Sequence, residues 1–173
     1  MRNFCLKFLP YNIIVVNMIP GFIDLTGAPW RVLPQGIHPA TLPEVETTLA
    51  INPRRRELFA GFVVGANALA AAGCQLLYLD GSYVTENPAP GDFDVCWEPA
   101  GVNPAKLDPV FFDMSNKRAA QKAKFNGEFL PVYRDSNGHS FIDFFQIEKF
   151  SGGKKGILSV QLSIAHMHKG ITP

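Results

Sequence analysis

The chain has 173 residues, which suits one domain, and its 47% hydrophobic and 18% charged residues exclude a disordered protein. Its formal net charge of +1 excludes a strong overall electrostatic attraction to nucleic acid or membrane, so any such affinity would need a local patch of positive charge. The cysteines Cys5, Cys74 and Cys96 are too far apart for a Cys-x-x-Cys metal site and too few for a disulfide framework. This usage favours a reducing, cytoplasmic setting, with Cys74 and Cys96 as small core residues.

Residues 1–40 are expected to form an N-terminal arm. Residues 4–16 are apolar, but polar residues and a proline interrupt them and the run is too short to cross a bilayer, so we expect no membrane contact. Met18 offers a second start, and residues 1–17 are interpreted as an upstream extension or a loosely packed arm. Many prolines and glycines in residues 19–40 predict an extended lead-in.

Two helices are predicted next. Thr41 and Glu44 form a capping-box pattern, which predicts a short helix over residues 42–49. An asparagine followed by Pro53 starts a second helix, in which apolar residues recur with the 3.6-residue period. The arginines at 54–56 are interpreted as its solvated first turn, with phosphate contact as the functional alternative.

Strands dominate the rest of the chain. Apolar runs bounded by turn residues predict five strands, at residues 75–79, 93–97, 129–134, 140–147 and 158–164. The turn residues 135–138 between the third and the fourth predict a hairpin. Ser115 is expected to cap a helix that continues to about Phe125. The prediction is one α+β domain over residues 41–173, with two N-terminal helices and about five strands.

Two carboxylates are the first candidate for chemistry. Asp92 and Asp94 are two apart in a predicted strand, so both would point to one face while Phe93 and Val95 point to the core. Two adjacent anions repel each other, and a fold gains little from them unless a cation joins them. Hard oxygen ligands at this spacing suit Mg²⁺, which also binds substrate phosphates.

A glycine and a serine precede these carboxylates. Gly81 and Ser82 follow a buried strand, where a glycine allows close approach of the backbone to a phosphate and a serine supplies hydrogen-bond donors. Either motif alone is weak, because turns often contain Gly-Ser or Asp-x-Asp. Their ordered combination, with nine residues between Ser82 and Asp92, is far more specific.

Asp143 is the third carboxylate of interest. It interrupts an apolar run, residues 141–145, that is typical of a strand buried on both faces. An ionised carboxylate there is costly unless it is paired or binds a metal. We favour a third metal ligand, and the alternative is a buried partner for Arg134 or for one of the arginines at 54–56.

The order of Gly-Ser, Asp-x-Asp and a later aspartate resembles the polymerase-beta-like nucleotidyltransferase superfamily. Over about three quarters of the chain, the sequence looks more closely like a family of short bacterial nucleotidyltransferase-like proteins. The segments that carry this likeness are LPQGIHPATL (33–42), RRRELF (54–59), AGCQLLYLDGSYVT (72–85), GDFDVCW (91–97), LDPVFF (107–112), RAAQKAKFNGE (118–128) and FIDFFQ (141–146).

The resemblance implies a mixed central sheet and a metal-dependent nucleotidyltransferase that moves a nucleoside monophosphate from an NTP to an RNA, tRNA or protein acceptor. Asp92, Asp94 and Asp143 would bind Mg²⁺ or Mn²⁺, and Asp143 would accept the proton of the attacking hydroxyl. Gly81 and Ser82 would hold the phosphates. By analogy, similar small proteins often belong to toxin–antitoxin or phage-defence pairs, which would supply a partner protein.

One departure concerns the phosphate charge. Many small relatives follow Gly-Ser with a turn that contains arginine, whereas this chain has Tyr-Val-Thr-Glu at 83–86. Residues 116–125 hold four cations and no acid, and Arg118 and Lys122 share a helical face. We expect this helix to contact the triphosphate or the acceptor, with a solvated surface helix as the alternative.

Two other functions compete. The nucleotidyltransferase scaffold could serve as a catalytically inactive, antitoxin-like module that binds a partner. The three carboxylates favour an enzyme, while the lack of a recognisable acceptor domain favours the module. A glycosyltransferase Asp-x-Asp is weaker, because the alternating βαβ pattern of a nucleotide-binding half is missing from the sequence.

Overall fold

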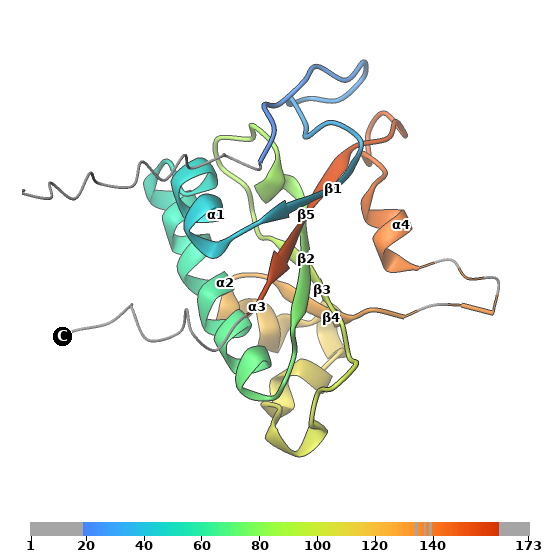
Figure 1. The fold of residues 1–173 in the computed structure, drawn as a ribbon. Helices are drawn as coiled ribbons and strands as arrows, with labels where there is room; N and C mark the ends of the chain where they lie inside the picture. Colours follow the sequence, from blue (N-terminus) through green and yellow to red (C-terminus); the bar gives the residue numbers. More distant parts are fainter. Residues whose placement is uncertain (1–18, 134, 137, 139, 163–173) are drawn as a thin grey trace, which may run out of the picture.

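The computed structural model describes residues 19–133, 135–136, 138 and 140–162 (Figure 1). The predicted upstream extension, residues 1–17, lies outside these ranges. Among the described residues, no helix combines the length and the apolar character that crossing a membrane requires.

A five-stranded mixed sheet forms the centre of the fold. Its strands are β1 (Gly36–Ala40), β2 (Leu76–Asp80), β3 (Asp94–Trp97), β4 (Glu128–Pro131) and β5 (Gly156–Gln161), in the order β1-β5-β2-β3-β4. The pairs β1–β5 and β3–β4 are parallel, and β5–β2 and β2–β3 are antiparallel. With the helices described below, this sheet confirms the predicted α+β class.

The two N-terminal helices form as their caps predict. In α1 (Leu42–Leu49), the Thr41 hydroxyl accepts from the Glu44 N–H, and the Glu44 carboxylate accepts from the Thr41 N–H. In α2 (Pro53–Ala71), the Asn52 side chain accepts from the Arg55 N–H, and proline occupies the first turn, where its missing N–H costs nothing.

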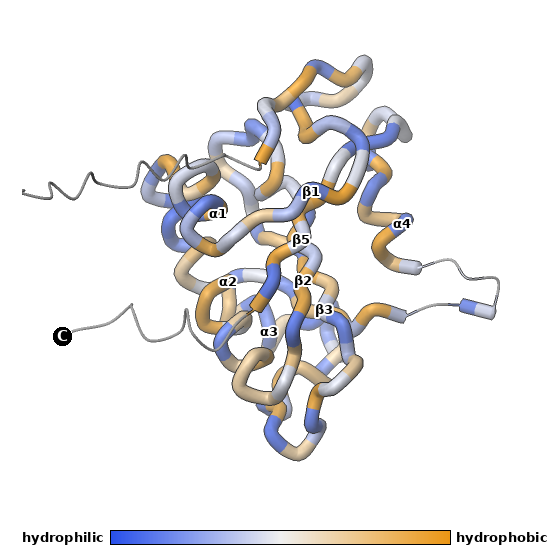
Figure 2. The backbone as a smooth tube through the Cα atoms, in the orientation of Figure 1, coloured by the Kyte–Doolittle hydropathy of each residue, from blue (hydrophilic) through white to orange (hydrophobic). Residues whose placement is uncertain are grey.

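The sheet separates two hydrophobic clusters. On one side, α1, α2 and α3 (Ala119–Phe125) pack on alternate strand residues, among them Leu79, Val95 and Phe129 (Figure 1). On the opposite side lies α4 (Phe141–Phe145), which Figure 2 shows mainly in the hydrophobic colour. Ile142 and Phe145 of α4 pack on Cys96 and Ile157. Cys74 and Cys96 are buried free thiols, as expected.

The last part of the predicted N-terminal arm belongs to the sheet. Residues 36–40 form β1 and pair in register with β5. Before β1, Val32 and Leu33 are 1% and 0% exposed and lie in the hydrophobic interior. The described part of the lead-in therefore packs against the domain. Contrary to the prediction, it is not extended throughout, because it folds back on itself where Ile23 pairs antiparallel with Val32.

The predicted strand at residues 140–147 is wrong, and with it the predicted hairpin. These residues contain α4, whose start is fixed by a capping box. Asp143 accepts hydrogen bonds from the Ser140 N–H and hydroxyl, at 2.9 and 3.1 Å. Ile142 and Phe145 are three apart, so they meet the sheet together only in a helix. This local capping outweighs the strand tendency of an apolar run.

The predicted helix over residues 115–125 is interrupted. A short 3₁₀ turn, η4 (Ser115–Lys117), precedes α3, and three successive residues, Asn116, Lys117 and Arg118, have positive φ between 46° and 60°. The other 3₁₀ turns are η1 (Ser82–Val84), η2 (Pro104–Lys106) and η3 (Pro109–Phe112).

Candidate metal-dependent active site

Three acids lie side by side at one end of the sheet. Asp80, the last residue of β2, is the register partner of Asp94, the first residue of β3. Asp94 is in turn the partner of Glu128, the first residue of β4. Register partners point to the same face, so these three side chains form one row, which we call the carboxylate row. It lies on the face covered by α4, which packs on the adjacent row of Tyr78 and Cys96.

Gly81 allows the chain to turn directly beside this row. Its φ is +83°, in the region that favours glycine, and it precedes η1, which begins at Ser82. A Cβ atom at position 81 would lie 2.5 Å from Oδ2 of Asp94. The glycine therefore gives the Asp94 carboxylate its place against the backbone of the turn.

Two arginines of α2 hold the connection between Gly81 and Asp92. Arg55 is 2% exposed and donates to the carbonyl oxygens of Asn87, at 2.6 Å, and of Tyr83. Arg54 donates to the carbonyl oxygen of Pro90 at 3.1 Å. The interpretation of both as a solvated turn is wrong for Arg55, because carbonyl oxygens replace its water. Their role is to fix both ends of the connection.

The surroundings of Asp94 disfavour the ionised form of its side chain. Burial, followed by the negative charges of Asp92, Asp80 and Glu128, raises the pKa of Asp94 to about 7, and the nearby Lys122 ammonium opposes this rise. Burial and nearby negative charge thus both disfavour the ionised form of Asp94. A bound cation would favour that form.

Cations of α3 approach the row from one end. Lys122 Nζ lies 2.9 Å from Oδ2 of Asp92 and 2.7 Å from Oε1 of Glu128. Arg118 Nε donates to the other oxygen of Glu128. The hydrogen bonds to Glu128 and Asp92 raise the pKa of Lys122. Arg118 precedes α3 rather than sharing a helical face with Lys122, but both side chains contact Glu128.

A buried ion pair closes the other end of the row. Lys155, one residue before β5, contacts the Asp80 carboxylate, and the two side chains are only 7% and 8% exposed. Burial raises the pKa of Asp80, while the Lys155 ammonium and the Gly81 N–H oppose that rise. Asp80 therefore connects β5 to the glycine turn.

Asp92 lies close to its expected place, and Asp143 does not. β3 begins at Asp94, so Asp92 stands just before the strand, near enough for its charge to act on Asp94. Asp143 is on α4 rather than on a strand adjacent to β3, and its carboxylate caps that helix. The alternative partner Arg134 lies outside the described residues. Asp143 thus caps α4, and its predicted place on a strand adjacent to β3 is wrong.

Glu128 is the acid that the sequence analysis missed. It is 5% exposed, and it stands beside Asp94 where Asp143 was expected. A glutamate directly before the apolar run of β4 was the available signal. Its meaning depends on the register between β3 and β4, which the sequence does not display.

The residues present suit a hard divalent cation in their chemistry. Asp92, Asp94 and Glu128 offer carboxylate oxygens, the donors that Mg²⁺ and Mn²⁺ prefer. Burial and then the neighbouring negative charges raise the pKa of Asp94. As the side chains stand, no group of three or more His, Cys, Asp or Glu residues among the described residues is arranged to hold a metal ion. Two of these three acids are instead held by the Lys122 ammonium.

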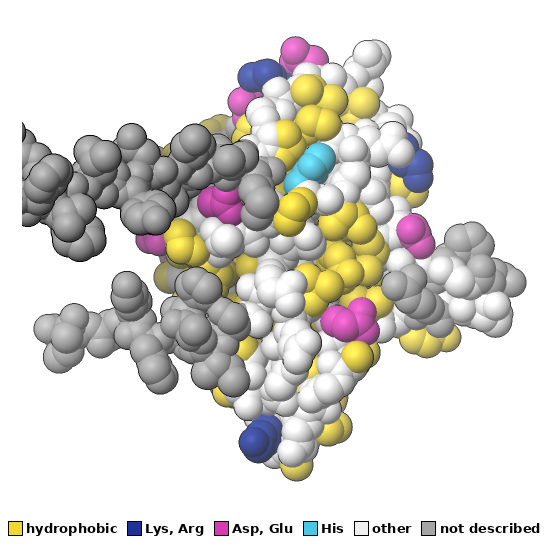
Figure 3. Space-filling model, viewed as in Figure 1, with side chains coloured by type: hydrophobic (Ala, Val, Ile, Leu, Met, Phe, Trp, Pro, Cys, Tyr) yellow, Lys and Arg dark blue, Asp and Glu magenta, His cyan; other side chains and the backbone are white. Residues whose placement is uncertain are grey.

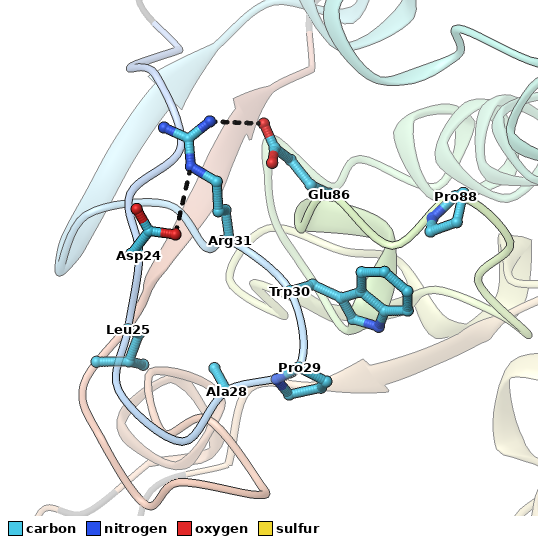
Figure 4. A pocket seen from close by; sticks show the side chains of 8 residues that line it. All are labelled: Asp24, Leu25, Ala28, Pro29, Trp30, Arg31, Glu86 and Pro88. Carbon is cyan, nitrogen blue, oxygen red and sulfur yellow. Dashed lines mark hydrogen bonds and ion pairs between the residues drawn. The ribbon is translucent and has the colours of Figure 1, made fainter.

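Two cavities lie away from these acids. One, of about 410 Å³, lies between the lead-in and the segment after η1, where Arg31 bridges Asp24 and Glu86 beside Trp30 (Figure 4). The second, of about 320 Å³, lies at α4. No member of the carboxylate row lines either one.

Most of the chain matches a known family. No curated protein and no solved structure matches it. The match to the family covers residues 28–161, which includes every strand of the sheet and the whole carboxylate row. The chain therefore belongs to DUF6932, a family of unknown function.

Proposed function

We propose that this protein is a metal-dependent nucleotidyltransferase that moves a nucleoside monophosphate from an NTP to an RNA, tRNA or protein acceptor. The observation that carries the proposal is the meeting of the Gly81 turn with Asp94 at the carboxylate row, beside Asp92. A phosphate that approaches the turn would be adjacent to acids that suit a divalent cation.

Asp92, Asp94 and Glu128 would hold Mg²⁺ or Mn²⁺. When bound, the ion supplies positive charge that stabilises the attacking and leaving oxygens of an in-line displacement. Ser82, half-exposed at the start of η1, offers its N–H and hydroxyl to a phosphate, while the Gly81 N–H already serves Asp80. Glu128 takes over the role first expected of Asp143, as third carboxylate and acceptor of the proton of the attacking hydroxyl.

Label transfer tests this proposal. The protein is incubated with each α-labelled NTP, Mg²⁺ or Mn²⁺, total tRNA and cell lysate, and transferred label is measured. We expect Asp94→Asn and Glu128→Gln to reduce transfer at least about 100-fold, because each removes charge where it is needed in the transition state. Asp143→Asn is the matched control and should retain transfer. Wild-type turnover in Asp94→Asn would disprove the assigned site.

A second function, a partner-binding module, is favoured by the outer face of α4. Phe144 and Phe150 are 67% and 66% exposed, and Phe141 and Ile147 are 41% and 38% exposed. Hydrophobic side chains also gather between the strands and α4 in Figure 3. Exposed apolar patches often mark protein interfaces, as a toxin–antitoxin partner would require. A module would keep its cellular effect in Asp94→Asn, whereas an enzyme would lose it.

A further inference from the structure

One ammonium group already occupies the space between two of the proposed metal ligands. Lys122 Nζ lies 2.9 Å from Asp92 and 2.7 Å from Glu128, and these acids come from segments far apart in the sequence. No other lysine among the described residues bridges two acids in this way. The side chain of Lys122 therefore acts as a counter-charge that links both acids.

A divalent cation and this ammonium compete for the same oxygens. Mg²⁺ requires oxygen ligands at about 2.0–2.1 Å in near-octahedral geometry, and a second cation within hydrogen-bond distance of those oxygens would repel it. In the structure, Asp92 and Glu128 are both turned toward Lys122. Lys122 has to withdraw before these two acids can serve a metal.

The surroundings of Lys122 allow it to withdraw. Its side chain is 41% exposed, so water can solvate the ammonium once it leaves the acids. Glu128 would keep a cationic partner, because Arg118 binds its other oxygen. By contrast, Lys155 is 7% exposed in its pair with Asp80 and has little access to water. Of the two lysines at the row, Lys122 is therefore the one that can exchange its partners.

We propose that Lys122 is a competing counter-cation, which a divalent metal displaces from Asp92 and Glu128 and which then binds the nucleotide phosphate. This inference rests on the proposed function, because it uses the same metal site. The turn after Ser82, residues 83–86, contains no arginine or lysine, and the displaced ammonium would supply positive charge to a triphosphate there. Lys122 therefore weakens metal binding alone and strengthens nucleotide binding in the presence of metal.

The proposal predicts opposite changes in two affinities, one for Mn²⁺ alone and one for a nucleotide analogue in the presence of Mn²⁺. Free Mn²⁺ is titrated by electron paramagnetic resonance against the wild type and Lys122→Met without nucleotide. We expect Lys122→Met to bind Mn²⁺ at least about tenfold more tightly, and to bind a non-hydrolysable ATP analogue with Mn²⁺ several-fold more weakly. Lys124→Met is the matched control, because Lys124 is in the same helix but pairs with Asp108, and it should leave both affinities unchanged.

Asp94→Asn distinguishes a failure of the Lys122 competition from a failure of the proposed metal site. If Lys122→Met and the wild type bind Mn²⁺ equally, and Asp94→Asn weakens both, the competition is disproved while the metal site stands. If Mn²⁺ binding ignores Asp94→Asn, the metal lies elsewhere and the proposed function fails with it. An unchanged analogue affinity in Lys122→Met would overturn the transfer of Lys122 to the phosphate.

Discussion

Lys155 and Lys122 pair with carboxylates at opposite ends of the same row, in very different surroundings. Lys155 and its partner Asp80 are 7% and 8% exposed. Lys122 is 41% exposed and shares its charge between Asp92, at 36%, and Glu128, at 7%. Water can replace a partner in the second case and has almost no access in the first.

This difference assigns separate tasks to the two lysines. A buried pair resists exchange, because removal of one partner leaves an uncompensated charge in a low-dielectric site. A half-exposed pair contributes little stability and exchanges its partner readily. Lys155 thus fixes the glycine turn through Asp80, whereas Lys122 is suited to leave its acids for another anion.

The largest expected effect is on the buried end of the row. Lys155→Met should lower the free energy of unfolding by about 3–5 kcal/mol at neutral pH, because Asp80 remains buried without its counter-charge. The deficit should shrink as the pH falls, since a protonated Asp80 needs no partner. Urea denaturation at several pH values measures both. Lys154→Met, an exposed neighbour, is the control. A loss below about 1 kcal/mol would contradict the conclusion that Lys155 and Asp80 form a buried ion pair to which water has little access.

A smaller effect of opposite sign is expected at the centre of the row. An aspartate titrates near 3.9 in an unfolded chain, and Asp94 has its pKa raised to about 7 in the fold. Between these values the folded state binds more protons, so the free energy of unfolding falls as the pH rises from about 4 to about 7. Asp94→Asn removes this penalty.

In EDTA at pH 8, we expect Asp94→Asn to be more stable than the wild type by about 2 kcal/mol, after allowance for solvent screening of a half-buried group. Urea midpoints between pH 4 and 8 should show a flatter profile, with a residual slope from Asp80. Asp24→Asn, at a side chain that is 95% exposed, should leave the profile unchanged. Equal profiles for Asp94→Asn and the wild type would mean that nearby positive charge already stabilises the ionised form of Asp94.

Features set by neighbouring residues could be predicted from the sequence. The caps at Thr41 and Asn52 gave both N-terminal helices, because their hydrogen bonds span only three residues. The same local logic was available for Asp143, where Ser140 three residues earlier repeats the arrangement of Thr41 and Glu44. The capping pattern was not recognised, because a run of five mostly apolar residues, 141–145, suits a strand as well as a helix.

Features set by strand pairing could not be predicted in this way. Glu128 joins the site only because β4 pairs with β3 in a register that places it beside Asp94. A shift of one residue would turn Glu128 to the opposite face. Lys155 likewise meets Asp80 across 75 residues of sequence. The sequence therefore indicated Asp92, Asp94 and Lys122, while strand pairing and tertiary structure added Glu128 and Lys155.

The smallest expected effect is at Lys122. Lys122→Met should cost less than about 1 kcal/mol of unfolding free energy in EDTA, because the ammonium is half-exposed and Arg118 still neutralises Glu128. Urea denaturation at pH 7.5, beside Lys124→Met, measures this change. A loss as large as that of Lys155→Met would make Lys122 a structural cation, which a metal could not displace without unfolding the site. A small loss would mean that Lys122 contributes little to the free energy of unfolding. A divalent cation could then displace its ammonium from Asp92 and Glu128 with almost no loss of stability.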